Sequence, residues 1–386
     1  MVKFAHIADA HLGGWKYEQM QNLNFESFKK AIDICIVSKV EFALFAGDLF
    51  DSAYPPIETL KETFAQFRRL KEAGIPCFII AGSHDYSVSG KTFLDVLEKS
   101  GFCKNVFNSE ERGDQIILNP HIHKNIALYG YPGKKSGLEI PELRRMKLND
   151  APGMFKIFML HTTLDKVAGN LPIEFLESEK LPYADYYALG HIHVLFNENK
   201  IVYPGPVFPN NFKELEDLKH GSFVIVDTES AEQIKFIKLL IKEIECLEFE
   251  FDDSLIATEK ILGELSKKDL KDKVILLRIN GELKRGKTSD IKFFQIEEFA
   301  KERGAYFLLK NIHNLRTKEI EMNLEIKNEG DIEQETIKIY SEKNKSDFNF
   351  FVQELMNTLS IEKQEDEKIE TFHSRLLAEA KRVLKF

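Results

Sequence analysis

The chain has 386 residues, of which 43% are hydrophobic and 30% charged, and its formal net charge is −9. This length exceeds that of one typical hydrophobic core, so we expect two or three domains. The negative charge argues against a broadly basic nucleic-acid-binding protein, although local basic patches remain compatible with it.

Two further features bear on the cellular location. No apolar run approaches the roughly 20 residues that span a bilayer, and the segment from Met1 to His6 lacks the layout of a signal peptide. The four cysteines are scattered and form no CxxC pair, which predicts reduced thiols and no structural zinc finger; they are Cys35, Cys77, Cys103 and Cys246. We therefore expect a cytoplasmic protein with no membrane partner.

The first hundred residues alternate short apolar strands with amphipathic helices. Strands are predicted at Val2–Ala8, Phe42–Ala46 and Phe78–Ile80, and helices at Asn24–Val37, after Pro55-Pro56 and at Thr92–Ser100. Strands that are apolar throughout are typical of a sheet covered on both faces.

Shorter strands joined by polar loops follow. They are predicted at Gln115–Leu118, Ile126–Tyr129, Lys156–Leu160, Tyr186–Leu189, Ile201–Tyr203 and Ser222–Val226. We expect a second sheet that packs on the first within one domain, residues 1–240. His121 and His123 follow Asn-Pro with no strand leading into them, and we interpret them as solvated loop histidines.

Residues 241–315 are predicted to form a small α+β domain with the order βαβαβ. Its strands are expected around Leu247–Phe251 and at Val274–Ile279 and Tyr306–Leu309, with one helix capped by Ser254 and another at Ser289–Arg303. Residues 316–386 contain a polar linker and two amphipathic helices, one after Ser346-Asp347 and one that carries Ile369 to Val383.

Side chains able to bind metal stand at the ends of several apolar strands. They are Asp9, His11, Asp48, Ser83, His84, His161, His191 and His193. Oxygen and nitrogen ligands without a thiolate suit Mn²⁺, Fe²⁺, Zn²⁺ or Mg²⁺. Taken singly, Asp9-x-His11 reads as a capped surface loop and His161 as a packed histidine. The ordered set instead predicts a two-metal site, in which Asp48 is a lone carboxylate able to bridge two ions.

The ordered pattern DxH…GD…GSHD…H…GHxH resembles the calcineurin-like metallophosphoesterases, in which GNHD is usual at the third position. Residues 1–230 are most similar to one branch, the Mre-eleven/SbcD-type DNA repair nucleases. Ala46-Gly-Asp48-Leu-Phe-Asp51, Tyr186-Tyr-Ala-Leu-Gly190-His-Ile-His193 and Tyr203-Pro-Gly205 carry this similarity. It implies an α/β fold: a four-layer α-β-β-α sandwich, a small α+β capping domain and a C-terminal helical segment.

The resemblance also implies roles for individual residues. One metal would be held by Asp9, His11, Asp48 and His193, and the other by Asp48, Ser83, His161 and His191. Mn²⁺ is the expected ion for both positions. His84 would stabilise the transition state or protonate the leaving oxygen, and Asp85 would orient His84.

The chain departs from the family at two positions. Ser83 stands where the family usually has asparagine, and a serine hydroxyl is a shorter and weaker ligand than an amide carbonyl. We therefore expect the second metal to bind less tightly, or a water to fill the gap. Asp51 stands where many members have histidine, which leaves its catalytic role open.

The function that the resemblance implies is a two-metal DNA exonuclease and endonuclease acting on duplex ends in double-strand break repair. A nucleoid-associated homodimer, paired through helices near residues 55–73 and 90–100, would act with an SbcC-type SMC-like ABC ATPase bound to residues 316–386. Those two helices could instead simply pack on each other. The alternatives to a nuclease are a small-molecule phosphodiesterase or nucleotidase of the same superfamily and a weakly active DNA-end-binding module.

One basic loop is a candidate DNA contact in the capping domain. Lys284, Arg285 and Lys287 lie between a predicted strand and a predicted helix, where they are expected to meet the phosphate backbone. A solvated turn is the alternative interpretation.

Overall fold

The computed structural model describes residues 2–86, 92–169, 173–230, 232–317, 337, 341, 347–364, 367 and 369–384. The chain divides into two compact units, Met1–Arg316 and Thr317–Phe386. No helix in the described part of the chain is long and apolar enough to cross a membrane.

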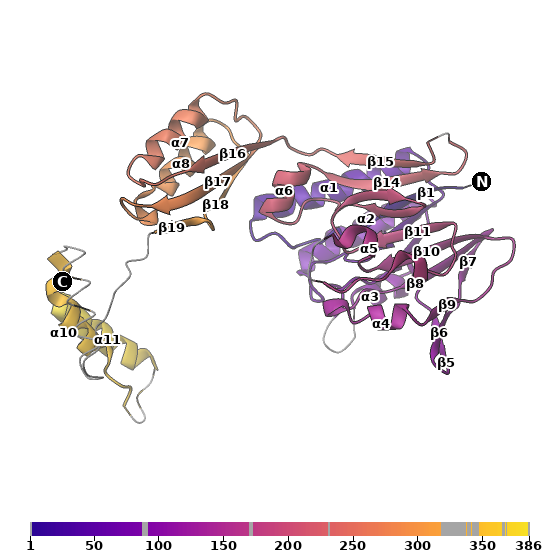
Figure 1. The fold of residues 1–386 in the computed structure, drawn as a ribbon, viewed down its shortest axis with the longest axis horizontal. Helices are drawn as coiled ribbons and strands as arrows, with labels where there is room; N and C mark the ends of the chain where they lie inside the picture. Colours follow the sequence, from indigo (N-terminus) through magenta and orange to yellow (C-terminus); the bar gives the residue numbers. More distant parts are fainter. Residues whose placement is uncertain are drawn as a thin grey trace. The chain divides into compact units, whose positions relative to one another are not determined.

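The first sheet of the larger unit has six strands in the order β15-β14-β1-β2-β3-β4. Its strands are β1 (Lys3–Ile7), β2 (Phe42–Ala46), β3 (Cys77–Ile80), β4 (Lys104–Asn105), β14 (Gly221–Asp227) and β15 (Ile234–Leu239). The run β1 to β4 is parallel, as expected for strands separated by helices. One face packs on α1 (Glu18–Val37), α2 (Ile57–Glu72) and α3 (Leu94–Lys99) through a core that contains Phe28, Phe45 and Phe67 (Figure 1).

The second sheet also has six strands, in the order β12-β13-β11-β10-β8-β7. These are β7 (His121–His123), β8 (Ile126–Tyr131), β10 (Phe155–His161), β11 (Tyr186–Gly190), β12 (Leu195–Glu198) and β13 (Ile201–Pro204). Phe42 and Phe78 from the first sheet and Met159 from the second share one core between the two sheets. This core makes the sheets the two inner layers of a sandwich.

The outer face of the second sheet is covered by short elements. They are η1 (Lys135–Gly137), α4 (Ile140–Leu143), α5 (Asp165–Ala168), η2 (Ser178–Lys180) and a small sheet of β5 (Ser109–Arg112), β6 (Gln115–Leu118) and β9 (Met146–Leu148). Tyr129, Ile140 and Phe158 lie in the core beneath them. The predicted four-layer sandwich is confirmed.

The capping domain has its own sheet and its own core. The elements are β16 (Ile244–Glu250), α7 (Ala257–Ser266), β17 (Val274–Leu283), η3 (Thr288–Asp290), α8 (Phe293–Glu302), β18 (Phe307–Asn311) and β19 (Leu315–Thr317). Strands β16, β17 and β18 are parallel, and α7 and α8 lie side by side on one face of the sheet (Figure 1). This is the predicted βαβαβ order. The boundary near residue 240 stays a prediction.

Two local expectations were wrong. Ser254 does not cap α7, because it is fully buried and its hydroxyl donates to the Arg285 carbonyl at 3.3 Å. His121 and His123 are not solvated loop histidines, because β7 pairs with β8 and both rings pack against Phe78 at centroid distances of 5.4 and 5.2 Å. The preceding proline obscured this short edge strand in the sequence.

The smaller unit contains η5 (Asp347–Phe351), α10 (Val352–Leu359) and α11 (Ile369–Leu384). The two α-helices contact each other. Several apolar side chains are exposed, namely Phe350 on η5 and Met356, Leu359, Ile369 and Leu377 on the α-helices. Ser346, which belongs to the predicted cap of the first helix, lies outside the described residues.

His6 gives the sandwich a specific acid sensitivity. It is fully buried in β1, where Nε2–H donates to the Leu189 carbonyl at 3.1 Å and Nδ1 accepts from the Tyr186 hydroxyl at 3.0 Å. Burial lowers the pKa of His6 to about 3. Below pH 6.5 the unfolded chain therefore binds a proton at His6 that the folded chain excludes, and stability falls until about pH 3.

We expect the His6 contribution to lower the free energy of unfolding by about 2 kcal/mol between pH 6.5 and pH 5. Urea unfolding at several pH values measures this loss in the wild type and in His6→Gln, which cannot titrate. The two curves should converge as the pH falls. Parallel curves between pH 6.5 and 5 would show that His6 does not control this interval.

Candidate metal centre

The predicted ligands gather where strands of both sheets end. Asp9 and His11 follow β1, Asp48 follows β2, Ser83 and His84 follow β3, His161 ends β10, and His191 and His193 follow β11. Their donor atoms form three overlapping groups, each with all atoms within 4.8 Å of one another: Asp9, His11 and His193; His11, Asp48 and His84; and Asp48, His161 and His191. Asp48 and His11 each belong to two groups, so the groups form one continuous centre.

The backbone at this centre is strained. Four of the predicted ligands have positive φ: Asp9 at 52°, His11 at 42°, Asp48 at 49° and His191 at 96°. Non-glycine residues in such conformations cost on the order of 1–3 kcal/mol each and are concentrated at functional sites. The surrounding structure therefore holds these side chains in place at an energetic cost.

Two glycines allow the loops to approach closely. A Cβ atom on Gly47, whose φ is 89°, would lie 2.2 Å from His161 Nδ1, and one on Gly82 would lie 2.2 Å from Asp48 Oδ1. Only glycine fits at either position. The Gly-Asp and Gly-Ser-His-Asp turns of the sequence thus follow directly from the packing of the candidate ligands.

Unpartnered polar atoms show that the residues fit a cation. Asp9 Oδ2 and His161 Nε2 are buried and find no hydrogen-bond partner among the described residues, although the latter atom lies 3.1 Å from Asp48 Oδ2. A buried polar atom without a partner is costly, and a bound ion would satisfy both atoms.

The facing rings of His11 and His193 also indicate that the centre fits a cation. Each donates its Nδ1 proton to a carboxylate, His11 to Asp51 at 3.1 Å and His193 to Glu214 at 3.0 Å. Their Nε2 atoms lie 3.1 Å apart, so that if each ring carries its proton on Nδ1 alone, two lone pairs face one point. A bound cation would stabilise this arrangement, and the donor set matches Mn²⁺, Fe²⁺, Zn²⁺ or Mg²⁺.

The charged groups buried in the centre shift one another's pKa values. Burial itself raises the pKa of Asp48, but the nearby charges of His161 and His11 outweigh it, and the pKa is lowered. Burial lowers the pKa of His161, yet Asp48 raises it to about 10. Cation binding through His161 must therefore release a proton. The pKa of His191 falls to about 3 by burial and by the charge of His161, so its ring is neutral.

Ser83 contacts the centre weakly. Its hydroxyl donates to Asp48 Oδ2 at 3.4 Å, near the limit for a hydrogen bond. We expect Ser83→Asn to tighten binding of the second ion severalfold, because an amide oxygen reaches farther and is a better ligand. Isothermal titration with Mn²⁺ measures this in both proteins, with Ser109→Asn on the exposed β5 as a control. Equal affinity for the second ion in wild type and Ser83→Asn would rule out a weakened second site.

His84 is held in one orientation at the surface of the centre. Its side chain is 47% exposed, and Nδ1–H donates to the Asp51 carbonyl at 2.8 Å. The backbone N–H of His84 donates to Asp48 Oδ1 at 2.8 Å. Nε2 is thereby left available for a bound substrate.

Asp85 does not orient His84, contrary to the expectation. Its buried carboxylate accepts hydrogen bonds from the backbone N–H groups of Gly82 at 2.9 Å, Phe50 at 3.1 Å and Leu49 at 3.3 Å. Burial and the charge of Asp48 raise its pKa to about 6. Asp85 therefore ties the loop after β2 to the loop after β3.

Two carboxylates with no role assigned from the sequence support the candidate ligands. Asp51 binds His11 and lies 3.8 Å from His84 Nδ1, and the hydrogen bond from His11 lowers its pKa. Glu214 binds His193. Asn211 and Glu214 cap the start of α6 (Phe212–Leu218), and their spacing in the sequence is typical of such a cap.

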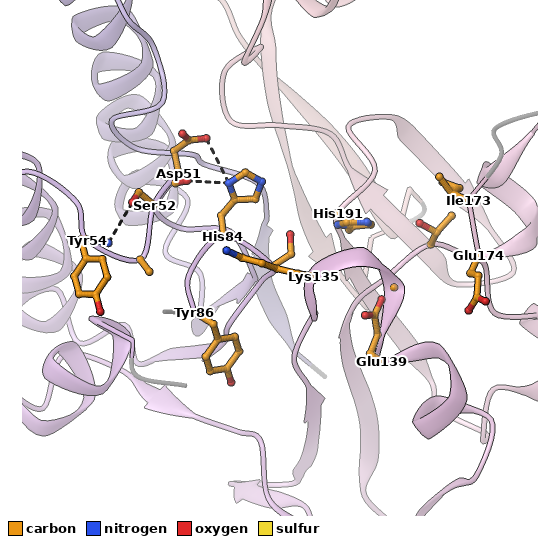
Figure 2. A pocket seen from close by; sticks show the side chains of 14 residues that line it. Asp51, Ser52, Tyr54, His84, Tyr86, Lys135, Glu139, Ile173, Glu174 and His191 are labelled. Atoms are coloured by element: carbon orange, nitrogen blue, oxygen red, sulfur yellow. Dashed lines mark hydrogen bonds and ion pairs between the residues drawn. The ribbon is translucent and has the colours of Figure 1, made fainter. Parts of the chain in front are cut away.

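A pocket of about 870 Å³ opens beside His84 and His191. Asp51, Tyr54 and Tyr86 lie on the His84 side, and Glu139 and Glu174 on the His191 side (Figure 2). Lys135 extends between the two sides toward His84 (Figure 2). Its ammonium group has no acidic partner among the described residues.

The basic loop of the capping domain is largely neutralised. Lys284 pairs with Asp252 and Arg285 with Asp253, each at 3.3 Å. Lys287 donates its backbone N–H to Asp290 at 2.6 Å, and its ammonium group has no acidic partner among the described residues. Two of the three expected DNA contacts are thus engaged within the protein.

Comparison with known proteins defines the class. The sequence matches the calcineurin-like phosphoesterase family over residues 2–195, and the chain belongs to this family. The expected fold class and the expected enzyme class, a metal-dependent phosphodiesterase, are thereby confirmed.

Three individual proteins are similar in sequence to this chain. A DNA double-strand break repair protein Mre11 from Methanocaldococcus jannaschii is 28% identical over 263 residues, which cover 64% of this chain and 68% of that protein. Another Mre11, from Sulfurisphaera tokodaii, is 32% identical over 213 residues, 50% of this chain and 49% of that protein. The uncharacterized metallophosphoesterase YhaO of Bacillus subtilis is 31% identical over 233 residues, 56% of this chain and 55% of that protein.

The chain thus spans about half the length of the latter two relatives. A solved archaeal phosphodiesterase structure covers 61% of the chain at 13% identity with a TM-score of 0.29, too low to bear on the fold.

Proposed function

We propose that this protein is a two-metal DNA nuclease that acts on DNA ends in double-strand break repair. The observation that carries the proposal is the convergence of Asp9, His11, Asp48, His161, His191 and His193 on one centre beside an open pocket. Similarity to proteins named for DNA double-strand break repair supports DNA as the substrate.

Each group has a distinct part in this proposal. Two divalent ions, with Mn²⁺ as the proposed metal, would withdraw charge from the phosphoryl oxygens and lower the pKa of the attacking water. His11 and His193 hold their ring orientation through Asp51 and Glu214. His84 Nε2 faces the substrate, where a protonated ring donates to the leaving oxygen.

Lys135 is proposed to bind a phosphate next to the one that is cleaved. Its ammonium group, for which the described part of the chain provides no acidic partner, extends into the pocket beside His84, in a protein whose net charge otherwise repels DNA (Figure 2). Tyr54, which is 72% exposed, and Tyr86 line the same pocket and offer aromatic faces to unpaired bases.

We expect Lys135→Gln to weaken DNA binding without sequence preference and to flatten the plot of log affinity against log salt by about 0.7 to 0.9. Fluorescence anisotropy of labelled DNA across a salt series measures the slope. Lys147→Gln, on the exposed side of β9, is the matched control and should keep the wild-type slope. A wild-type slope in Lys135→Gln would remove Lys135 from the phosphate contacts.

The smaller unit is proposed to bind the ATPase partner. Phe350 on η5 is 87% exposed, and Leu359 and Ile369 on the helix pair are 53% and 64% exposed, as expected for an apolar surface that a coiled coil covers. Pairing of two copies through α2 and α3 is proposed likewise, and Ile57 on α2 is 80% exposed.

The test compares linear duplex DNA with a generic phosphodiester, bis(p-nitrophenyl) phosphate, in the presence of Mn²⁺. Cleavage of both substrates, with loss of both on chelation, supports the nuclease. Hydrolysis of the generic diester alone would favour a small-molecule phosphodiesterase. Binding of DNA without hydrolysis of either substrate would favour an end-binding module.

A further inference from the structure

The short helix α6 lies between the candidate metal centre and the capping domain. Leu215, in the middle of α6, is fully buried in a core shared with Trp15, Met20 and Leu23 and with the capping-domain residues Val274, Leu276 and Leu309. The helix α6 thus packs against one face of the capping-domain sheet, and α7 and α8 cover the opposite face.

One end of α6 holds a candidate metal ligand. Glu214 Oε1 accepts the Nδ1 proton of His193 at 3.0 Å. The same carboxylate accepts from the Asn210 backbone N–H at 2.8 Å and from Asn211 Nδ2 at 2.6 Å. These bonds lock the Glu214 side chain to the start of the helix, so the ring of His193 must follow any shift of α6.

The capping domain also binds to α6. Arg278 on β17 binds Glu216 with two parallel hydrogen bonds, Nε to Oε1 at 3.0 Å and Nη2 to Oε2 at 2.8 Å. Its guanidinium also lies over the Phe212 ring, 5.0 Å from the centroid. A bidentate arginine–carboxylate pair fixes both distance and orientation, and only 15% of the Arg278 side chain is exposed.

We infer that α6 links the capping domain to the metal centre, and that Arg278 is a positioning residue for His193. The inference rests on the proposed role of His193 as a metal ligand. Through the bonds from Arg278 to Glu216 and from Glu214 to His193, the placement of the capping domain determines how well one of the two ions is held. Binding of DNA to the capping domain would then alter the metal centre itself.

The test measures metal affinity instead of nuclease activity. Mn²⁺ titration by calorimetry is applied to the full chain with Arg278→Met, which keeps an unbranched apolar side chain over Phe212 but removes the paired charge. We expect roughly three- to tenfold weaker binding of one ion and no change for the other. Hydrolysis of bis(p-nitrophenyl) phosphate, which is too small to require the capping domain, should fall at subsaturating Mn²⁺ and recover at saturation. Arg303→Met, on an exposed part of the capping domain, should behave as wild type.

Two further variants distinguish a failure of the link through α6 from a failure of the proposed function. Glu214→Gln should weaken the same ion by roughly 10- to 100-fold, because it removes the direct partner of His193. The double exchange Arg278→Glu with Glu216→Arg should restore affinity toward the wild type. Unchanged affinity in a folded Arg278→Met protein, with a loss in Glu214→Gln, would overturn the link and leave the proposed function standing. A wild-type protein that binds no Mn²⁺ would overturn the proposed function, and the link with it.

Discussion

Asp48→Asn is expected to lower kcat/KM for phosphodiester hydrolysis by roughly 10³-fold or more. Asp48 takes part in two of the three ligand groups, so one substitution weakens both metal positions. A metal ion contributes several kcal/mol of transition-state stabilisation, and each 1.36 kcal/mol corresponds to a factor of ten. The asparagine keeps the size of the side chain and an oxygen that accepts from the His84 backbone N–H, so the loop after β3 should persist.

Metal stoichiometry gives the second measurement for Asp48→Asn. The variant should retain fewer than two ions per chain after dialysis against micromolar Mn²⁺, whereas the wild type retains both. Asp114→Asn, a surface carboxylate that is 91% exposed, is the matched control and should change neither value. Activity of Asp48→Asn within tenfold of the wild type would contradict a bridging role.

His84→Gln is expected to reduce DNA cleavage by roughly 10²- to 10⁴-fold while Mn²⁺ affinity stays at the wild-type value. His84 is the most exposed member of the centre, and its Nδ1 atom is occupied by the Asp51 carbonyl. Its remaining nitrogen can therefore deliver a proton to a leaving oxygen.

The leaving group separates the two possible roles of His84. A nitrophenolate ion departs without protonation, whereas the alkoxide of a DNA strand requires it. The loss in His84→Gln should consequently be larger for DNA than for bis(p-nitrophenyl) phosphate. His84 also lies within ligand distance of His11 and Asp48, so an equal loss on both substrates with weaker Mn²⁺ binding would make it a ligand instead. His313→Gln, on an exposed turn of the capping domain, is the control.

The sequence predicted the sandwich and the candidate ligands because both depend on local patterns. An apolar strand followed by glycine and a polar residue identifies a strand end, and parallel strands bring such ends to one edge of a sheet. Asp9, Asp48 and His161 could be found in this way. The element order of the capping domain could also be predicted from the sequence. The helix expected at Ser289–Arg303 is, however, divided into η3 and α8.

Contacts between distant segments escaped prediction. Asp85 binds the backbone of Leu49 and Phe50, more than 30 residues earlier, so its adjacency to His84 was misleading. The basic loop at Lys284 appeared free because Asp252 approaches it only through the pairing of β16 with β17. Side-chain partners of this kind depend on strand register, which the sequence alone does not specify.

The origin of the candidate ligands has a mechanical consequence. Asp9, His11 and Asp48 belong to loops of the first sheet, whereas His161, His191 and His193 belong to the second. An ion held by residues from both sheets acts as a removable cross-link at one edge of the sandwich. Chelation would leave the apolar core between the sheets intact and free only that edge. The concentration of free metal would then set how stably the two sheets are held together at the edge beside the pocket.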